Sequence, residues 1–392
     1  MKKSLLSLAL GGLGIGTTEF VIMGLLPDIA GSFDISIPEA GHLISAYALG
    51  VVIGAPTLVA FSGSYPPKKI LIGLMALFTL FNGLTALAPG YTSMVLARLF
   101  SGLPHGAFFG VGAVVASRLA DKGKAAQAIS IMFAGLTIAN LAMVPLGTYI
   151  GHNFSWRFTF GIIAGIGLIT MLAISVWMPA MPVKRKGSLK EELRFFRRTD
   201  AWLIILLTAI GTGGLFSWIS YIAPLMIHVT HFNENLVPYI MMLAGLGMLA
   251  GNFLGGKMAD ILSPAKACML SMLGIVACLV VDYFTADNQV MTLVMTFLTG
   301  AIAFTLSAPI QLLMIQTAKD AEMLGASVTQ AGFNMGNALG AYWGGLPIAA
   351  GFGFASPLLV GVGMAIFGIF ILWLLMRHQD GKSLVLIPGL RR

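Results

Sequence analysis

Residues 50–54 of this chain read GVVIG, and residues 247–251, 197 positions further on (247 − 50), read GMLAG. At the same offset, other residues that control backbone conformation and helix packing are identical in pairs: Gly14 and Gly211, Gly16 and Gly213, Pro27 and Pro224, Gly135 and Gly332, Asn140 and Asn337, Gly147 and Gly344. The chain of 392 residues therefore contains two copies of one unit. A period this long excludes a solenoid and fits a membrane protein built from two related halves.

The composition agrees with a membrane protein. Hydrophobic residues make up 57% of the chain and charged residues 10%, whereas about 25% of the residues of a soluble protein are charged. Apolar runs of about 20 residues, long enough to cross a hydrocarbon core of about 30 Å, recur along the chain. They predict six spans in each copy, at residues 4–26, 41–62, 69–88, 92–117, 126–149, 157–178, 201–225, 237–259, 266–284, 289–317, 322–347 and 352–377.

These spans predict an all-α integral membrane protein with twelve transmembrane helices in two pseudo-symmetric six-helix bundles. The bundles comprise residues 1–180 and 201–392, and a cytoplasmic linker at 181–200 joins them. In the linker, Leu189, Leu193 and Phe196 have the spacing of a short amphipathic helix. We expect the first span to be retained rather than cleaved as a signal peptide, because residues 11–27 have their repeat partner in 208–224.

The positive charges predict the orientation, because Lys and Arg near span ends are retained on the cytoplasmic side. Most fall on the side of the chain termini: Lys2, Lys3, Lys68, Lys69, Arg118, Lys122, Lys124, the cluster at 184–198, Lys257, Lys266, Lys319, Arg377, Lys382, Arg391 and Arg392. Arg157 falls on the opposite side, whose loops are assigned Asp28, Asp34, Glu39, Glu234, Asp282 and Asp287. We therefore expect both termini in the cytoplasm of a bacterium and the chain in its inner membrane. The net charge of +8 reflects this bias and not a nucleic-acid surface.

Charged residues inside a span are candidates for function, because each costs about 2.5 to 3.5 kcal/mol at the membrane centre. Glu19 and Arg98 are the two clear cases. His105 joins them, because Arg98, Ser101, Gly102 and His105 have the spacing of one helix face. We assign proton coupling to Glu19, Arg98 and His105. The alternatives are a structural cation at Arg98 and a hydrogen-bonded packing residue at His105.

The predicted spans place Glu19 and Arg98 at one depth. Glu19 lies roughly 10 Å and Arg98 roughly 9 Å below the surface opposite the termini, at 1.5 Å per helical residue. We therefore expect the two side chains to interact.

Several segments resemble one family. They are GTTEFVIMGLLPDIA (16–30), RLFSGLPHGAFFGVGAVV (98–115), GLTIANLAMVPLGTYIG (135–151), SWRFTF (155–160), GNFLGGKMAD (251–260) and AGFNMGNALGAYWGG (331–345). The chain resembles the twelve-span drug:proton antiporter branch of the major facilitator superfamily, and more narrowly its arabinose-efflux-like sugar exporters. The resemblance implies the major facilitator fold and alternating access.

The resemblance also implies a conformational role for one loop. The family has an acidic residue nine positions after the glycine that Gly54 matches, but this chain has Gly63 there. The second copy keeps its acid, Asp260, nine residues after Gly251. In the family this acid is thought to clasp one conformational state at a helix terminus, so the clasp is expected on one side only, unless the loop has merely drifted. In span five, Gly135, Asn140, Pro145 and Gly147 have an architectural role, in close helix packing and bending.

Polar and aromatic residues on spans that would line a cavity are candidates for substrate binding. They are Phe20, Tyr47, Phe108, Trp218, Tyr221, Gln330, Asn334 and Asn337. The alternatives are lipid-facing or packing roles for the aromatic residues and hydrogen bonds between helices for the amides.

The sequence has no nucleotide-binding loop, no metal-ligand spacing and no nucleophile elbow, so we expect no enzyme and no cofactor. We predict a proton-coupled antiporter that exports sugars or small amphipathic compounds, using the proton gradient as its energy source. A multidrug/proton antiporter or a proton-coupled importer is the alternative, and an integral-membrane enzyme or sensor a distant one. The expected partners are a small-molecule substrate, protons and the lipid bilayer, with no nucleic acid, and the chain is expected to be a monomer.

Overall fold

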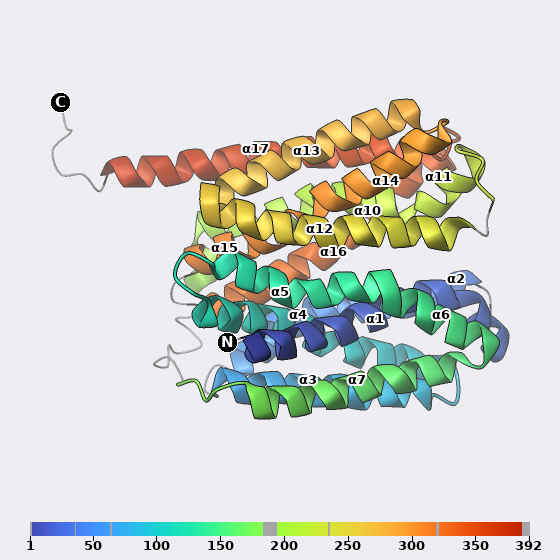
Figure 1. Cartoon of the computed structure of the whole chain (residues 1–392), viewed down its shortest axis with the longest axis horizontal. Coiled ribbons are helices and arrows are strands. Elements are labelled where there is room, and N and C mark those ends of the chain that lie inside the picture. Colours follow the sequence, from blue (N-terminus) through green and yellow to red (C-terminus); the bar gives the residue numbers. More distant parts are fainter. Residues whose placement is uncertain are drawn as a thin grey trace.

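Two layers of near-parallel helices make up the computed structural model of the chain (Figure 1). The structure describes residues 2–35, 37–62, 65–182, 194–233, 236–318 and 321–385, and within these ranges its regular elements are all helices. The first layer contains the N-terminal helices and the second the C-terminal ones, as the blue-to-green and yellow-to-red ribbons show. The predicted all-α fold is therefore confirmed.

The first bundle has six spans, the fifth of them made of three consecutive elements. They are α1 (Lys2–Phe33), α2 (Ile37–Ser62), α3 (Pro67–Ala86), α4 (Tyr91–Leu119), α5 (Ala125–Ile138) with the π-turn η1 (Ala139–Met143) and α6 (Val144–Asn153), and α7 (Trp156–Trp177).

A 3₁₀ turn, η2 (Arg194–Arg197), precedes the second bundle. Its spans are α9 (Thr199–Leu206) with the π-turn η3 (Leu207–Gly211), α10 (Gly213–Ser220) and α11 (Ile222–His228), then α12 (Val237–Leu262), α13 (Pro264–Thr285), α14 (Gln289–Phe304) with α15 (Ser307–Thr317), α16 (Glu322–Ala349) and α17 (Ser356–Val385). Of the predicted amphipathic helix, Leu189 and Leu193 lie outside the described residues, and Phe196 lies in η2.

All twelve predicted spans coincide with helices. Eleven of them are apolar and long enough to cross a membrane by these criteria alone, within the described part of the chain. The remaining one is α16, which carries Gln330, Asn334 and Asn337. The largest differences are at span ends: α1 continues to Phe33 although the predicted span ends at 26, and α17 continues to Val385 although the predicted span ends at 377.

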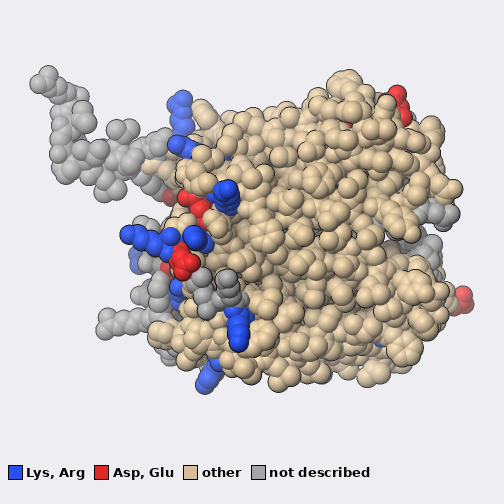
Figure 2. Space-filling view, viewed as in Figure 1, with Lys and Arg blue, Asp and Glu red and all other residues tan. Residues whose placement is uncertain are grey.

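The basic residues gather at one end of the molecule, where α1 begins and α17 ends (Figure 2). We call this the terminal end and the opposite one the far end. At the terminal end Lys68 donates to the carbonyls of Ser175 and Met178 at 2.8 and 2.6 Å, so it caps the C-terminus of α7. Arg157, the exception at the far end, donates to the carbonyls of Ala86 and Ala88 at the C-terminus of α3, at 3.1 and 2.7 Å. A capping role thus explains why a cation is kept there.

The paired glycines of GVVIG (50–54) and GMLAG (247–251) bring helices into backbone contact. A Cβ atom at Gly50 or Gly54 of α2 would overlap the backbone of Leu99 or Leu103 of α4. Only glycine lets two helices approach so closely.

The second bundle repeats this contact. A Cβ atom at Gly247 or Gly251 of α12 would overlap the backbone of Phe297 or Ala301 of α14. The partner of Leu99 is thus Phe297, at an offset of 198 (297 − 99), although α2 and α12 correspond at 197. The chain has gained one residue between the second and fourth spans of the second copy, a register change that the glycines of α2 and α12 alone do not show.

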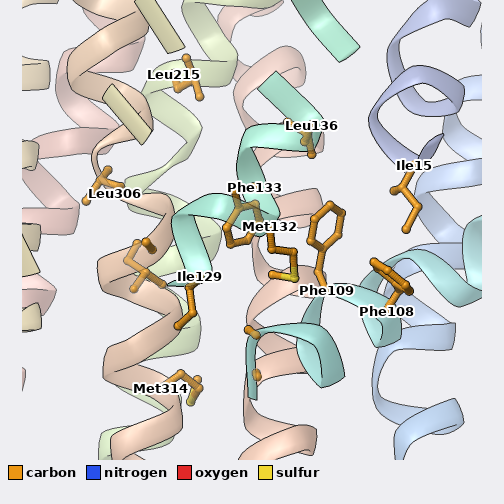
Figure 3. Close-up of a cluster of buried hydrophobic side chains, with 14 of the residues drawn as sticks. Ile15, Phe108, Phe109, Ile129, Met132, Phe133, Leu136, Leu215, Leu306 and Met314 are labelled. Atoms are coloured by element: carbon orange, nitrogen blue, oxygen red, sulfur yellow. The ribbon is translucent and has the colours of Figure 1, made fainter. Parts of the chain in front are cut away.

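The two bundles meet along α2 and α4, which pack against α16, and along α5, which packs against α12 and α15. Apolar side chains fill the space beside this interface (Figure 3). The Phe109 and Phe133 rings stack with 5.0 Å between their centroids, which joins α4 to α5. This core holds the inner faces of the first bundle in place.

Candidate transport site

Arg98 of α4 is fully buried and holds the centre of the first bundle. Its Nη1 atom donates to the carbonyl and the hydroxyl oxygens of Thr18 on α1, at 3.1 and 3.0 Å. Its Nε and Nη2 atoms are buried and have no hydrogen-bond partner among the described residues. One of the three guanidinium nitrogens is therefore anchored to the protein, and the other two keep their donors free.

Thr18 also connects Arg98 to α3. Its hydroxyl donates to Oδ1 of Asn82 at 2.5 Å, and Nδ2 of Asn82 donates to the carbonyl of Phe78 at 2.8 Å. A chain of hydrogen bonds thus links α4, α1 and α3 through buried side chains. Thr18 and Asn82 were not among the residues predicted from the sequence, although an amide in the apolar third span is a signal for Asn82.

Glu19 follows Thr18 on α1 and is half-buried. Its carboxylate interacts electrostatically with Arg98 and Tyr47, but it forms no ion pair within 4.0 Å in the part of the chain that the structure describes. The structure therefore brings Glu19 and Arg98 together, as the matching depths predict, and leaves them unbonded.

Tyr47 of α2 connects the cation to the histidine. The guanidinium carbon of Arg98 lies 4.3 Å from the centre of the Tyr47 ring, a cation–π contact. The Tyr47 hydroxyl lies 3.1 Å from Nδ1 of the buried His105. Tyr47 comes this close because Gly102 of α4 has no Cβ to overlap its backbone.

The candidates for proton coupling thus form one cluster with Tyr47. His105 also packs its ring 5.3 Å from that of Phe109. Its hydrogen bond to Tyr47 agrees with the alternative of a packing residue as well as with a role in coupling. The Ser101 hydroxyl bonds within its own helix, where it donates to the carbonyl of Arg98 at 2.9 Å.

The other aromatic candidates do not join this cluster through any described contact. Phe108 is fully buried and faces Gly11 of α1, in the core of the first bundle. Phe20 is half-buried and packs against the same core. In the second bundle Tyr221 donates to the carbonyl of Ala341 at 2.7 Å, and Trp218 is 1% exposed. For Phe108 and Trp218 the packing alternative describes the observed surroundings.

The amide candidates form a separate polar group on α15 and α16. Nε2 of Gln330 donates to Oε1 of Gln311 at 3.3 Å, and Nε2 of Gln311 donates to the carbonyl of Ala326 at 2.8 Å. Asn334 donates to the carbonyl of Gln330 at 3.2 Å, and Asn337 is half-buried one turn further on. Gln311 was missed by the sequence analysis, although it is the first amide in the apolar run of α15.

Asp260 joins the two bundles at the terminal end. Its two carboxylate oxygens accept hydrogen bonds from the backbone N–H groups of Ala126 and Gln127, both at 3.0 Å, at the N-terminus of α5. The helix dipole and the free N–H groups of a first turn favour a carboxylate there. Gly63, the counterpart in the first copy, lies outside the described residues.

Further contacts between the bundles lie near Asp260. Ser130 and Asn252 exchange hydrogen bonds through side chains and carbonyls, at 2.9 and 2.7 Å. Arg118 at the end of α4 forms an ion pair of 2.8 Å with Glu322 at the start of α16. These contacts hold the bundles together at the terminal end.

The span-five residues have structural surroundings. A Cβ atom at Gly135 would overlap the backbone of Ala9 on α1, and Asn140 donates to the carbonyl of Leu136 within its own helix at 3.3 Å. Asn140 lies in the π-turn η1, just before Pro145, whose missing N–H relaxes the helical hydrogen bonding. At the far end Thr159 donates to the carbonyl of Gly147 at 2.7 Å.

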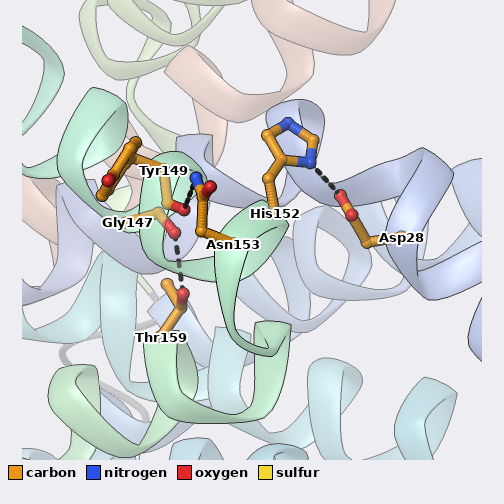
Figure 4. Close-up of polar contacts among 6 residues, drawn as sticks. All are labelled: Asp28, Gly147, Tyr149, His152, Asn153 and Thr159. Atoms are coloured by element: carbon orange, nitrogen blue, oxygen red, sulfur yellow. Dashed lines mark hydrogen bonds and ion pairs between the residues drawn. The ribbon is translucent and has the colours of Figure 1, made fainter.

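A close contact between a histidine and a carboxylate connects this part of span five to the first helix. His152 of α6 lies 2.6 Å from Asp28 of α1 (Figure 4). The far end of span five is therefore linked to α1 by this pair and to α7 by the Thr159 hydrogen bond.

Asp282 corrects the sequence analysis. It was assigned to a loop on the side opposite the termini, but it lies within α13 and is fully buried. The helix continues through Tyr283 and Phe284 to Thr285, so Asp282 lies on its last turn and not in the loop that follows. The two cysteines, Cys268 and Cys278, are both free.

Among the residues that the structure describes, no group of three His, Cys, Asp or Glu side chains is arranged to hold a metal ion.

Residues 8–326 match the model of the Major Facilitator Superfamily. The chain belongs to this superfamily. It is 44% identical over 351 residues to the putative transporter AraJ of Escherichia coli K12, covering 90% of this chain and 89% of that one. It is 39% identical over 377 residues to the inner membrane transport protein YdhP of the same strain, covering 96% of both, and 29% identical over 334 residues to a probable sugar efflux transporter of Helicobacter pylori, covering 85% of both.

The fold is that of solved transporters of this superfamily. The E. coli fucose:proton symporter FucP superposes with a TM-score of 0.77 over 95% of this chain and 98% of that one, at 14% identity. This superfamily protein is thus a multi-pass inner-membrane transporter and not an enzyme. As a transporter, it binds a small-molecule substrate within the membrane.

Proposed function

We propose that this transporter exports sugars or small amphipathic compounds in exchange for protons, by alternating access of a site between the two bundles. The observation that carries the proposal is Glu19, a half-buried carboxylate beside a fully buried Arg98 whose Nε and Nη2 donors are unused among the described residues. The identity to a relative named as a probable sugar efflux transporter supports the substrate class.

The geometry supports competition between a proton and the substrate. When Glu19 is ionised, its carboxylate is the natural acceptor for the free donors of Arg98. When Glu19 binds a proton, this charge disappears, and the Arg98 donors are left for the hydroxyl groups of a ligand. The site then has two states that differ by one charge, as antiport of a proton against a neutral solute requires.

The amide group of Gln311, Gln330 and Asn334 supports a hydroxylated ligand. Amides both donate and accept hydrogen bonds, so they suit hydroxyl groups better than an apolar drug. Sugars therefore fit this second polar group. Lipophilic compounds, the substrates of the alternative multidrug antiporter, would instead contact the aromatic candidates.

The basic terminal end supports a cytoplasmic location for both termini. In that orientation the contacts of Asp260, Ser130 and Arg118 close the cytoplasmic end of the substrate path. The described conformation then corresponds to a state that is shut toward the cytoplasm.

Glu19→Gln tests proton coupling. In liposomes with an imposed pH gradient, we expect the variant to lose gradient-driven transport and to keep exchange of labelled against unlabelled substrate, which needs no net proton movement. Phe216→Gln is a matched control, because it places the same amide at the corresponding position of the second bundle (216 − 197 = 19). Gradient-driven transport by Glu19→Gln at the wild-type rate would contradict the proposal.

The substrate class is tested by the thermal stability of the purified protein. A ligand that binds only the folded state raises the unfolding temperature by mass action. We expect stabilisation by mono- or disaccharides and a smaller shift with lipophilic cations. The reverse order would favour the multidrug alternative.

A further inference from the structure

The second bundle contains a buried acid that the proposed function does not use. Asp282 of α13 is fully buried, and neither of its carboxyl oxygens has a hydrogen-bond partner among the described residues. It lies three residues before the end of α13, or about 4.5 Å at 1.5 Å per residue. Its position is therefore close to the far surface and remote from Glu19, which belongs to the other bundle.

Three helices bring polar groups to this acid. The indole of Trp218 on α10 interacts with the carboxyl group, yet its buried Nε1 atom does not reach a hydrogen bond. Cys278, one turn earlier on α13, interacts with both Asp282 and Thr299 of α14, whose hydroxyl is also buried without a hydrogen bond. The Trp218 N–H is thus a donor beside Asp282 that is free to bond an ionised carboxylate, and the Thr299 hydroxyl is a second free group at the level of Cys278.

No described cation faces Asp282. The helices that pack against α13 are α10, α12, α14, α15 and α17. On α10, α14 and α15 there is no acidic or basic residue, and Tyr221 directly follows α10. The titratable groups with described side chains on α12, α13 and α17 are Tyr239, Lys257, Asp260, Lys266, Cys268, Cys278, Tyr283, Arg377 and His378.

Of these groups only Cys278 interacts with Asp282. Lys266 is the cation on the same helix, and its distance along the axis is about 24 Å (16 residues at 1.5 Å). An ionised carboxylate that is buried without a cation or a hydrogen bond is strongly unfavourable, and such a group takes up a proton instead.

We propose that Asp282 is a second proton-binding site, separate from Glu19, which exchanges its proton with the medium at the far end. The neutral acid is compatible with the described arrangement, in which no partner closes on the carboxyl group. Loss of the proton creates a buried charge that draws the free Trp218 N–H into a hydrogen bond with the carboxylate.

This change acts on a helix end. Trp218 lies two residues before α10 ends at Ser220, where the seventh span breaks before α11 begins at Ile222. Ser217 and Tyr221 tie the same segment to α17 and α16, through hydrogen bonds of 2.6 and 2.7 Å to the carbonyls of Pro357 and Ala341. The proton on Asp282 therefore biases how firmly α10 is held to α13 at the far end.

Trp218 itself provides the measurement. We would replace the other five of the six tryptophans (Trp156, Trp177, Trp202, Trp343 and Trp373) by Phe and record the fluorescence of Trp218 in lipid nanodiscs as a function of pH. We expect one sigmoidal, single-proton change in emission. Asp282→Asn should remove it, and Glu19→Gln should leave it in place, so the result does not depend on Glu19 as a coupling site.

A pH-independent emission, a transition that survives Asp282→Asn, or one that Glu19→Gln removes would overturn the proposal. If the single-tryptophan protein does not fold, difference infrared spectroscopy of the wild type serves instead. We then expect the carboxylic C=O band that appears on acidification to be smaller in Asp282→Asn by the contribution of one group. An unchanged band would likewise overturn the proposal.

Discussion

The two bundles share their helix contacts but not their polar centres. Gly50 and Gly54 of the first bundle, and Gly247 and Gly251 of the second, press against the backbone of a neighbouring span in the same way. At the positions corresponding to the proton-coupling cluster the second bundle is nearly apolar: Phe216 for Glu19, Ala244 for Tyr47 and Thr296 for Arg98, the last at the offset of 198. Both copies thus keep the same helix contacts, whereas the intramembrane charges of Glu19 and Arg98 are present in the first copy only.

The physical reason is that the two kinds of residue meet different demands. A glycine at a backbone contact is required wherever that contact exists, because any Cβ would overlap. A buried charge is costly wherever it stands, so each copy keeps one only where that copy uses it, and Asp282 of the second bundle lies at a position different from those of Glu19 and Arg98. The four predictions below test this contrast, from the largest expected effect to the smallest.

Arg98→Met should have the largest effect on stability. It removes the cation beside the half-buried Glu19 and the two hydrogen bonds to Thr18, each of which, as a bond from a charged group, is worth about 1.5 to 3 kcal/mol. The double variant Glu19→Gln with Arg98→Met should recover much of this stability while remaining uncoupled. The midpoint of thermal unfolding in detergent measures both effects.

The matched control is Thr296→Val in the second bundle. The Thr296 hydroxyl donates only within its own helix, to the carbonyl of Thr292 at 2.7 Å, so its loss should cost about 1 kcal/mol or less. An effect as large as that of Arg98→Met would mean that the polar centres of the two bundles are equally important.

Gly50→Ala and Gly247→Ala should destabilise the protein to a similar degree. In both, the new methyl group meets a backbone carbonyl, of Leu99 or Phe297, and forces the helices apart at a cost of about 1 to 3 kcal/mol. Gly165→Ala is the control, because nothing lies within 4 Å of its Cβ position. That change should be neutral or stabilising in the same unfolding measurement. A large difference between the two core variants would show that the bundles do not share one scaffold.

Asp260→Asn should shift the protein toward states that are open at the terminal end. It removes the charge that faces two N–H groups of α5, worth about 1 kcal/mol or a roughly fivefold change in populations. Labelling of single cysteines placed along the substrate path, in a background without Cys268 and Cys278, reads the shift. Asp287→Asn, on an exposed residue at the far end, should leave the labelling pattern unchanged.

Gly63→Asp should have the smallest effect. It restores the acid that the first copy lacks, and a carboxylate near a helix terminus contributes about 0.3 to 1 kcal/mol at an exposed position. We expect a measurable change in the same labelling assay, in the balance between the two open states. Labelling identical to that of the wild type would mean that this loop tolerates either residue.

Most of the membrane topology could be predicted from the sequence, because hydropathy and charge bias are properties of short segments. The span ends were less accurate, since α1 continues to Phe33 and α17 to Val385, and Asp282 was assigned to a loop although it lies inside a helix. A charged residue near a span end has a low local hydropathy whether it faces solvent or a neighbouring helix. Only the packing of α10 and α14 around α13 decides which of the two it does.

The candidate site shows the same division. The sequence by itself determined that Glu19 and Arg98 are intramembrane charges at one depth, because length and rise per residue set depth. The tertiary structure decided that Thr18 and Asn82 anchor Arg98, that Tyr47 lies between Arg98 and His105, and that α14 is shifted by one residue against its repeat. Depth follows from position along one helix, whereas partners depend on how helices far apart in the chain rotate and slide against one another, and no single segment encodes that.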